Sequence, residues 1–251
     1  MYKKVILITG GSKGIGNQLI KYFLKKGFFV INLDNQKYNF NSDNYKFYKF
    51  DLNKYNDIEH FSKRIFKKFK IDILINNARF NSKKKYSLSA ETITDWEQTF
   101  NINLNSHFFL SKQFLNSHKD NKKKQYIINI SSISGSLITS ESPSYNISKA
   151  AITHMTKYIA RYGINFDTFC FSISPGLIIK TQFLEVFNDP KNKNFKKKAK
   201  FLNPKIGSDK DIFNLILFII NGKADYMNGH NFILDGGSSH HEQFDLLLKY
   251  N

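Results

Sequence analysis

The chain has 251 residues, 41% of them hydrophobic, and a formal net charge of +18. This length and apolar content allow one sizeable core, so a single domain over residues 1–251 is expected. No apolar run approaches the about 18 residues of a membrane-spanning helix, and the first apolar run leads into a glycine turn without a cleavage-site pattern. We therefore expect a cytoplasmic protein with neither a membrane span nor a signal peptide. The single cysteine, Cys170, lies in an apolar run and is interpreted as a small buried hydrophobe.

The excess of positive charge is divided among short lysine runs. The runs within residues 81–87, 120–126 and 191–200 combine Lys with Asn, and they lack the arginines and interleaved aromatic residues of a groove that stacks nucleic-acid bases. We expect solvated lysine surfaces and no nucleic-acid partner.

Short apolar runs alternate with amphipathic stretches along the chain. Strands are predicted over residues 3–9, 28–33, 45–50, 71–76, 125–131, 168–174 and 231–235. Helices are predicted between the first two strands, where a helical pattern ends at Gly27, and over residues 54–69, 96–118, 144–162 and 209–221. This alternation predicts a Rossmann-like, doubly wound α/β fold with a parallel sheet of about seven strands and helices on both faces. Residues 181–207 are too polar for a core and long for a plain connection, so they are interpreted as either a short helical lid or a mobile loop, and the family resemblance described below implies a substrate loop or lid here.

A glycine turn, TGGSKGIG over residues 9–16, follows the first strand and opens the first helix. Glycines in this position let backbone N–H groups approach a pyrophosphate, which the start of the helix also attracts. The spacing of Gly10, Gly14 and Gly16 departs from the G-x-G-x-x-G dinucleotide fingerprint. Taken alone, the pattern also fits a tight turn that binds no ligand.

Asp34 ends the second strand, where a carboxylate can accept hydrogen bonds from an adenosine ribose and repel a 2′-phosphate. This position favours NAD over NADP. Lys13, inside the glycine turn, points weakly the other way because a cation there could meet the 2′-phosphate.

Eight short motifs follow one another over almost the whole chain. They are TGGSKGIG at 9–16, DL at 51–52, NNA at 76–78, NIN at 101–103, NISSISG at 129–135, YNISK at 145–149, PG at 175–176 and LDGG at 234–237. In order and spacing, these motifs resemble the short-chain dehydrogenase/reductase family.

The pair Tyr145 and Lys149 has a chemical interpretation of its own. A phenol has a pKa of about 10 and is a poor base at neutral pH unless a nearby cation stabilises its phenolate. Residues four apart on a helix lie on one face, so we expect Lys149 to lower the pKa of Tyr145 and make it a general acid/base. Tyrosine and lysine at this spacing are also common on helices with no catalytic role.

The resemblance implies two further catalytic residues, Ser132 and Asn103. Ser132 would hold the substrate oxygen together with Tyr145, although Ser131 and Ser134 are rivals. Asn103 would position a water on a proton path from Lys149, with Asn101 and Asn105 as alternatives. The resemblance further implies a nicotinamide cofactor, no metal, and a homo-oligomer, either a dimer or a tetramer. The residues implied to bind the cofactor are Gly10, Ser12, Lys13, Gly14, Ile15, Gly16, Asp34, Asp51, Leu52, Asn76, Asn77, Ala78, Tyr145, Lys149, Pro175, Gly176 and Thr181.

The sequence departs from the family pattern at several places. Arg79 stands where the family has a glycine after NNA, so this cation either extends to solvent or meets an acidic group of the substrate. Phe171 replaces an asparagine four residues before PG, and Thr181 falls one residue late. Trp96 is expected in the core.

These features lead to an expected function. We expect an NAD(H)-dependent oxidoreductase that interconverts an alcohol and a carbonyl on a small polar or acidic substrate, sugar-related compounds included, with substrate contacts from Arg79, Ser132 and Tyr145. One alternative is a 3-oxoacyl-(acyl-carrier-protein) reductase that uses NADPH and meets its acidic carrier through Lys122–Lys124. The other is a cofactor-binding regulator without turnover.

Overall fold

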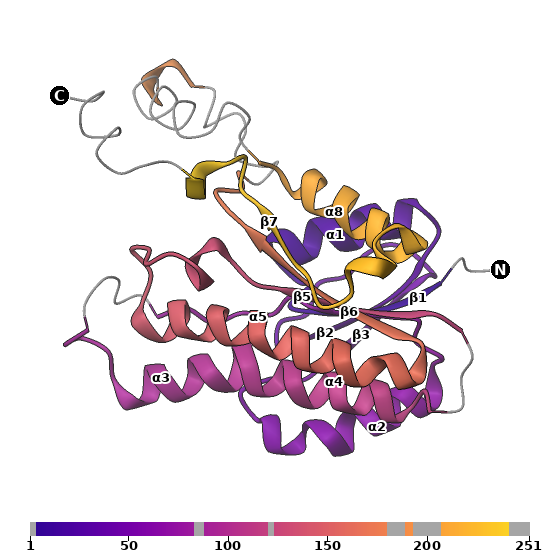
Figure 1. Ribbon diagram of the computed structural model, residues 1–251. Helices are drawn as coiled ribbons and strands as arrows, with labels where there is room; N and C mark the ends of the chain where they lie inside the picture. Colours follow the sequence, from indigo (N-terminus) through magenta and orange to yellow (C-terminus); the bar gives the residue numbers. More distant parts are fainter. Residues whose placement is uncertain (1–3, 83–87, 120–122, 180–188, 193–206, 241–251) are drawn as a thin grey trace.

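The computed structural model describes residues 4–82, 88–119, 123–179, 189–192 and 207–240. Its centre is a seven-stranded sheet in the order β3-β2-β1-β4-β5-β6-β7, and every pair of neighbouring strands is parallel (Figure 1). The predicted fold class is confirmed. The strands are β1 Val5–Thr9, β2 Phe29–Asp34, β3 Tyr45–Lys49, β4 Ile73–Asn76, β5 Gln125–Ile130, β6 Thr168–Pro175 and β7 Asn231–Leu234.

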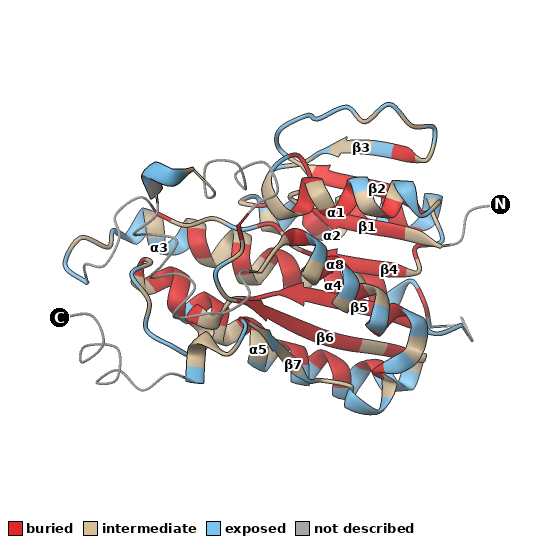
Figure 2. Ribbon diagram, turned by 90° about the horizontal axis from the view of Figure 1, so that it is seen from above, coloured by how far each residue is buried: buried red, intermediate tan, exposed pale blue. Residues whose placement is uncertain are grey.

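Helices cover both faces of this sheet. Figure 1 shows α1 and α8 on one side and α2, α4 and α5 on the other. The central strands are buried on both faces (Figure 2), which explains why they read as continuous apolar runs rather than as alternating patterns. The helices are α1 Gly14–Lys25, α2 Ile58–Lys68, α3 Ile93–Phe100, α4 Ser106–Asn116, α5 Pro143–Gly163 and α8 Asp209–Phe218.

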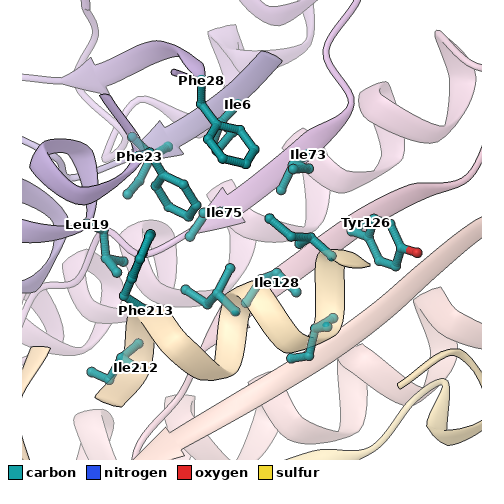
Figure 3. Packing of buried hydrophobic residues seen from close by; sticks show 14 of the residues in the cluster. Ile6, Leu19, Phe23, Phe28, Ile73, Ile75, Tyr126, Ile128, Ile212 and Phe213 are labelled. Carbon is teal, nitrogen blue, oxygen red and sulfur yellow. The ribbon is translucent and has the colours of Figure 1, made fainter. Parts of the chain in front are cut away.

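The core on the α1 and α8 side is built around Phe23. This fully buried ring lies edge-on to Phe28, with 5.2 Å between the ring centroids, and edge-on to Phe213 of α8 at 5.1 Å (Figure 3). Such tilted aromatic pairs stabilise a core beyond the area they bury. The contact fixes α1, and with it the glycine turn at the start of α1, against the sheet.

The helix predicted over residues 96–118 is in fact three segments. Thr92 caps α3, its side chain accepting a hydrogen bond from the Asp95 N–H at 3.1 Å, and α3 is followed by a π-helical turn, η2 Asn101–Asn105, before α4 begins. A second π-helical segment, η7 Ile219–Lys223, follows α8. Sequence periodicity cannot find such turns because one extra residue leaves most of the apolar pattern in place.

Two expectations about single residues have different outcomes. Cys170 is fully buried, and burial raises the pKa of its thiol, so its interpretation as a small hydrophobe is confirmed. Trp96 was expected in the core, but it is 40% exposed on α3 and lies beside Phe100, with 4.8 Å between the ring centroids.

Within the described ranges, no helix is both long and apolar enough to cross a bilayer.

The strand order reverses at β1, whose neighbours are β2 on one side and β4 on the other. In open parallel sheets, ligands bind beyond the carboxyl ends of the strands at such a reversal. The turns that follow β1, β4 and β5 therefore meet at the edge of the sheet where a site is expected.

Candidate active site

The glycine turn is packed tightly against the segment that follows β4. Gly10 has a φ of +67°, and a Cβ on it would lie 2.7 Å from the Cα of Ala78, so only glycine fits there. The Thr9 hydroxyl accepts hydrogen bonds from the N–H groups of Asn77 and Ala78, both at 3.0 Å. The Asn77 side chain in turn donates to the carbonyl oxygens of Thr9 and Gly10. The turn after β1 and the turn after β4 thus form one unit.

Two polar side chains of β2 hold the glycine turn from the other side. The carboxylate of Asp34 accepts from the Ser12 N–H at 2.9 Å and from the Gln36 N–H at 3.0 Å. Asn32, fully buried, accepts from the Gly11 N–H at 3.0 Å and donates to the hydroxyls of Ser12 and Tyr45. Sequence reasoning missed Asn32, although a lone amide within the apolar run of β2 was the available signal.

Tyr145 lies in the first turn of α5. Ser142 caps this helix and accepts a hydrogen bond from the Tyr145 N–H at 3.3 Å, and Pro143 at the first helical position has the backbone angle that a helix start requires. Tyr145 is 6% and Lys149 is 1% exposed. The Lys149 Nζ atom lies 5.5 Å from the centroid of the Tyr145 ring and donates to the Ile130 carbonyl at 2.9 Å. The structure therefore brings the two predicted residues together at the end of β5.

Ser132 is the serine that interacts with the phenol. Burial raises the pKa of Tyr145, and the hydrogen bond with Ser132 is one of the interactions that oppose this rise. The rivals are engaged elsewhere, because the Ser131 hydroxyl donates to the Lys149 carbonyl at 2.8 Å and the Ser134 hydroxyl contacts those of Ser132 and Thr139.

The electrostatics of the phenol differ from the expectation. Burial raises the pKa of Tyr145 above its usual value, and the cation that opposes this shift most is Arg79, not Lys149. The pKa of Lys149 is itself lowered to about 7, first by burial and then by the charge of Arg79. The prediction that Lys149 lowers the pKa of Tyr145 treated the lysine as fully charged. It left out the low dielectric around a buried ammonium.

Asn103 lies in the π-helical turn η2, and its side chain is fully buried. Its amide accepts from the Phe80 N–H at 2.7 Å and donates to the Phe80 carbonyl and the Ser148 hydroxyl, both at 3.0 Å. The side chain therefore ties the segment after β4 to α5. Among its rivals, Asn101 bonds to Asn53 and Asn105 instead. A π-helical turn at such a position is typical of functional sites.

The remaining expected cofactor residues are in varied surroundings. Asn76, expected to line the site, is fully buried and donates to the Asn129 side chain at 2.8 Å, so its amide braces β4 against β5 instead. Leu52 belongs to the core, whereas Lys13 and Asp51 are exposed. Pro175 ends β6, and the Gly176 N–H donates to the Leu234 carbonyl at 3.1 Å. Thr181 and nearly all of the expected loop at 181–207 lie outside the described residues, and Phe171 is fully buried.

A buried histidine beneath this site was not anticipated. His107 of α4 is fully buried, and neither ring nitrogen completes a hydrogen bond of ordinary geometry with a described residue. Burial, and secondarily the charge of Lys149, lowers the pKa of His107 to about 3, outweighing the Ala78 backbone, which favours the protonated ring. His107 is therefore neutral at physiological pH.

The residues at this edge fit a dinucleotide. The glycine turn leaves no room for a side chain at Gly10, and a Cβ at Gly16 would lie 2.4 Å from the Gly10 carbonyl oxygen, so both glycines allow the tight turn that leads into α1, and the start of a helix can bind a pyrophosphate. Asp34 places a carboxylate at the end of β2, where a ribose would lie.

The family model for short chain dehydrogenases matches residues 4–192. The chain belongs to the short-chain dehydrogenase family. It is therefore an oxidoreductase that acts on CH–OH groups with a nicotinamide cofactor, NAD or NADP.

Two curated relatives match almost the full length of this short-chain dehydrogenase. The 3-oxoacyl-(acyl-carrier-protein) reductase FabG of Buchnera aphidicola subsp. Schizaphis graminum is 30% identical over 251 residues and covers 94% of this chain and 97% of its own. The 2-dehydro-3-deoxy-D-gluconate 5-dehydrogenase of Bacillus subtilis is 28% identical over 245 residues, with 93% and 94% covered.

Solved structures agree with this assignment and differ in their cofactors. A 4-hydroxyisoleucine dehydrogenase complexed with NADH and succinate superimposes with a TM-score of 0.81 at 30% identity, covering 94% of this chain and all of its own. ElxO with NADP bound has a TM-score of 0.80 at 28% identity and covers 95% and 100%.

Proposed function

We propose that this short-chain dehydrogenase uses NAD(H) to interconvert an alcohol and a carbonyl on a small polar or acidic substrate, sugar-related acids included. The observation that carries the proposal is the meeting of three side chains at the ends of β5 and α5. The phenol of Tyr145 lies beside the hydroxyl of Ser132 and one helical turn from the ammonium of Lys149. This group faces the same sheet edge as the glycine turn.

Each side chain has a role in the proposed reaction. Tyr145 takes the proton of the substrate hydroxyl during oxidation and returns it during reduction. Ser132 holds the substrate oxygen beside the phenol and stabilises the negative charge that develops on it. Lys149, with a pKa of about 7, can gain and lose a proton at neutral pH and would serve the proton path between this site and solvent. When bound, the nicotinamide ring supplies or accepts the hydride.

The proposed preference for NAD rests on Asp34. Its carboxylate would accept hydrogen bonds from the ribose hydroxyls and would repel a 2′-phosphate. ElxO, a related structure, binds NADP, so the preference is a property to measure for this chain. Asp34→Ala should weaken NADH binding far more than NADPH binding in fluorescence titrations, and equal losses would contradict the preference.

An acidic substrate is supported by Arg79. This cation is exposed, and its guanidinium carbon lies 5.7 Å from the centroid of the Tyr145 ring. Two related proteins agree with such a substrate, because one is complexed with succinate and the other is named for a sugar acid.

The test of the function is a substrate panel with wild-type protein and Tyr145→Phe. Hydroxy acids, sugar nucleotides and acyl thioesters should be assayed at 340 nm with each nicotinamide cofactor. We expect turnover of at least one carbonyl or alcohol. Tyr145→Phe should lose it while binding NADH within about threefold of the wild type, because only the proton transfer is removed. Retained turnover in Tyr145→Phe would refute the proposed acid/base.

A 3-oxoacyl-(acyl-carrier-protein) reductase is the second candidate, and the FabG relative favours it. Its expected carrier contact included Lys124, but that lysine forms an ion pair with Asp225 at 2.7 Å, while Lys122 lies outside the described residues. Turnover of acetoacetyl thioesters with NADPH that exceeds turnover of free acids would select this candidate. Loss of Ser132, Tyr145 or Lys149 would be expected of a cofactor-binding regulator, and all three are present.

We further propose a cytoplasmic homo-oligomer. The outward faces of α4 and α5 expose Phe108, Ile147, Tyr158 and Tyr162, at 38%, 48%, 71% and 50%. Apolar side chains gathered on two neighbouring helices are typical of an interface. Light scattering should give the mass of a dimer or a tetramer.

A further inference from the structure

Arg79 reaches the group that transfers the proton. Its guanidinium lies against the ring of Tyr145, and the two side chains also interact through a hydrogen bond that favours the phenolate. A guanidinium has several N–H donors in one plane, so it can contact the phenol and still bind a second acceptor.

The backbone on both sides of Arg79 is fixed. The Thr9 hydroxyl holds the N–H groups of residues 77 and 78, and Asn103 holds both the N–H and the carbonyl of Phe80. The Arg79 side chain, however, is exposed, and within the described ranges it forms no ion pair with a carboxylate. The structure thus presents an anchored cation whose charge is available to a ligand.

Arg79 is the strongest positive charge that acts on the phenol, because Lys149, with a pKa of about 7, is only partly protonated at neutral pH. Arg79 from the turn after β4 and Lys149 from α5 face the ring, and Ser132 adds a hydroxyl from the end of β5. The facing carboxylate is Glu141, which accepts a hydrogen bond from the Asn81 amide at 2.7 Å and raises the pKa of Tyr145. His107, from α4 beneath Lys149, is neutral. The charge of Arg79, which forms no ion pair among the described residues, favours a ligand with a negative charge.

Geometry limits where that charge lies on the substrate. The reacting oxygen must lie about 2.5–3.0 Å from the phenol oxygen, and a carboxylate oxygen about 2.7–2.9 Å from the guanidinium. Because the phenol and the guanidinium are in contact, these contacts in series keep the two substrate oxygens within about 8 Å of each other, and oxygens about 3–5 Å apart can meet both groups from one side. A carboxyl carbon attached to the reacting carbon or to its neighbour gives this shorter separation.

We propose that Arg79 binds the carboxylate of a 2- or 3-hydroxy acid, or of the matching oxo acid, while it keeps its contact with the Tyr145 phenol. This inference rests on the proposed function and names its substrate class. It makes Arg79 both a specificity residue and a positioning residue for the phenol.

The shared guanidinium has a consequence for the proton. A guanidinium shared with a carboxylate stabilises the phenolate less, so substrate binding raises the pKa of Tyr145 and holds the proton on the phenol. The phenol then gives this proton to the substrate oxygen as the carbonyl is reduced. The carboxylate of an oxo acid thus favours the protonated form of Tyr145, which is the form that donates a proton in the reduction.

The direct test compares an anion with its neutral counterpart. Succinate and succinamide are titrated by calorimetry into the NADH complex of the wild type, of Arg79→Gln and of Arg64→Gln. Arg64 is a matched control, because it is also an exposed arginine beside an aromatic ring, that of Phe61, and it lies on α2 away from the site. We expect succinate to bind the wild type and Arg64→Gln alike and to bind Arg79→Gln at least about 30-fold more weakly. Absent binding of succinate, equal binding of succinamide, or binding unchanged by Arg79→Gln would overturn the inference.

Kinetics separate this inference from the proposed function. The wild type is assayed with 2- and 3-hydroxy acids and with their methyl esters. Arg79→Gln should lower kcat/KM at least about 100-fold for the acids and less than about fivefold for the esters. It should also raise the pKa of the catalytic base, Tyr145, in the pH profile of ester oxidation. A merely structural role of Arg79 would not change this pKa. Equal losses for acids and esters would overturn the inference and leave the function standing. If neither the wild type nor Tyr145→Phe turned over any substrate of the panel, the proposed function would be refuted instead.

Discussion

The burial of His107 predicts a specific weakness of the fold in mild acid. A histidine in the unfolded chain binds a proton below a pH of about 6.5, whereas the folded protein excludes that proton until a pH of about 3. Between these values the unfolded state binds more protons, so stability falls as the pH falls. Each pH unit below about 6.5 costs the folded state about 1.4 kcal/mol, which amounts to about 2 kcal/mol at pH 5.

The assay is urea unfolding of the wild type and of His107→Leu, at pH 7.5 and at pH 5. Carboxylates and other histidines contribute equally to the pH dependence of the unfolding free energy in both proteins. The difference between the two pH dependences therefore isolates the contribution of His107. We expect the wild type to lose about 2 kcal/mol more than the variant, or about 0.7 M in midpoint at a slope of about 3 kcal/mol/M. Parallel losses would show that the imidazole is protonated or solvated in the folded state, and the reasoning from burial would be refuted.

Three further changes test other parts of the structure. Asn32→Leu leaves the buried Gly11 N–H without its acceptor and should cost about 2–4 kcal/mol in urea unfolding while weakening NADH binding; unaltered NADH affinity would show that Asn32 does not hold the glycine turn. Gly10→Ala should weaken NADH binding at least about tenfold, because its Cβ would lie 2.7 Å from the Ala78 backbone, and a normal titration would contradict this packing. Phe23→Ala should cost about 3–5 kcal/mol in the same unfolding assay, and a loss below about 1 kcal/mol would mean that the α1–α8 contact repacks.

The fold was predictable because its strands carry an unambiguous signal. The runs that form β4 and β5 are apolar on both faces, and each lies between amphipathic stretches. The π-helical turn at Asn101–Asn105 was not predictable, because a single inserted residue shifts the helix face without breaking the apolar pattern. The exposure of Trp96 was missed because the type of a residue does not reveal whether another element covers it.

The sequence pointed to side chains that lie close together, but it did not give their electrostatics. Tyr145 and Lys149 were proposed from their spacing and Ser132 from the family resemblance, and the three side chains lie together in the structure. The burial of Lys149, which brings its pKa to about 7, depends on contacts from β5 and α5 that are distant in the sequence. The same holds for Asn103, whose bonds to Phe80 and Ser148 join three separate segments. Spacing identifies side chains that share an edge, while their ionisation depends on what covers them.

The double attachment of residues 77–80 has a consequence for how this enzyme could evolve. Threonine and asparagine side chains hold the backbone of this segment on either side of residue 79, so neither attachment depends on which side chain stands between them. A substitution at residue 79 would therefore remove the charge that we propose binds the substrate, while the glycine turn and α5 keep their positions. On this proposal, substrate preference depends on one position that can be replaced without loss of folding.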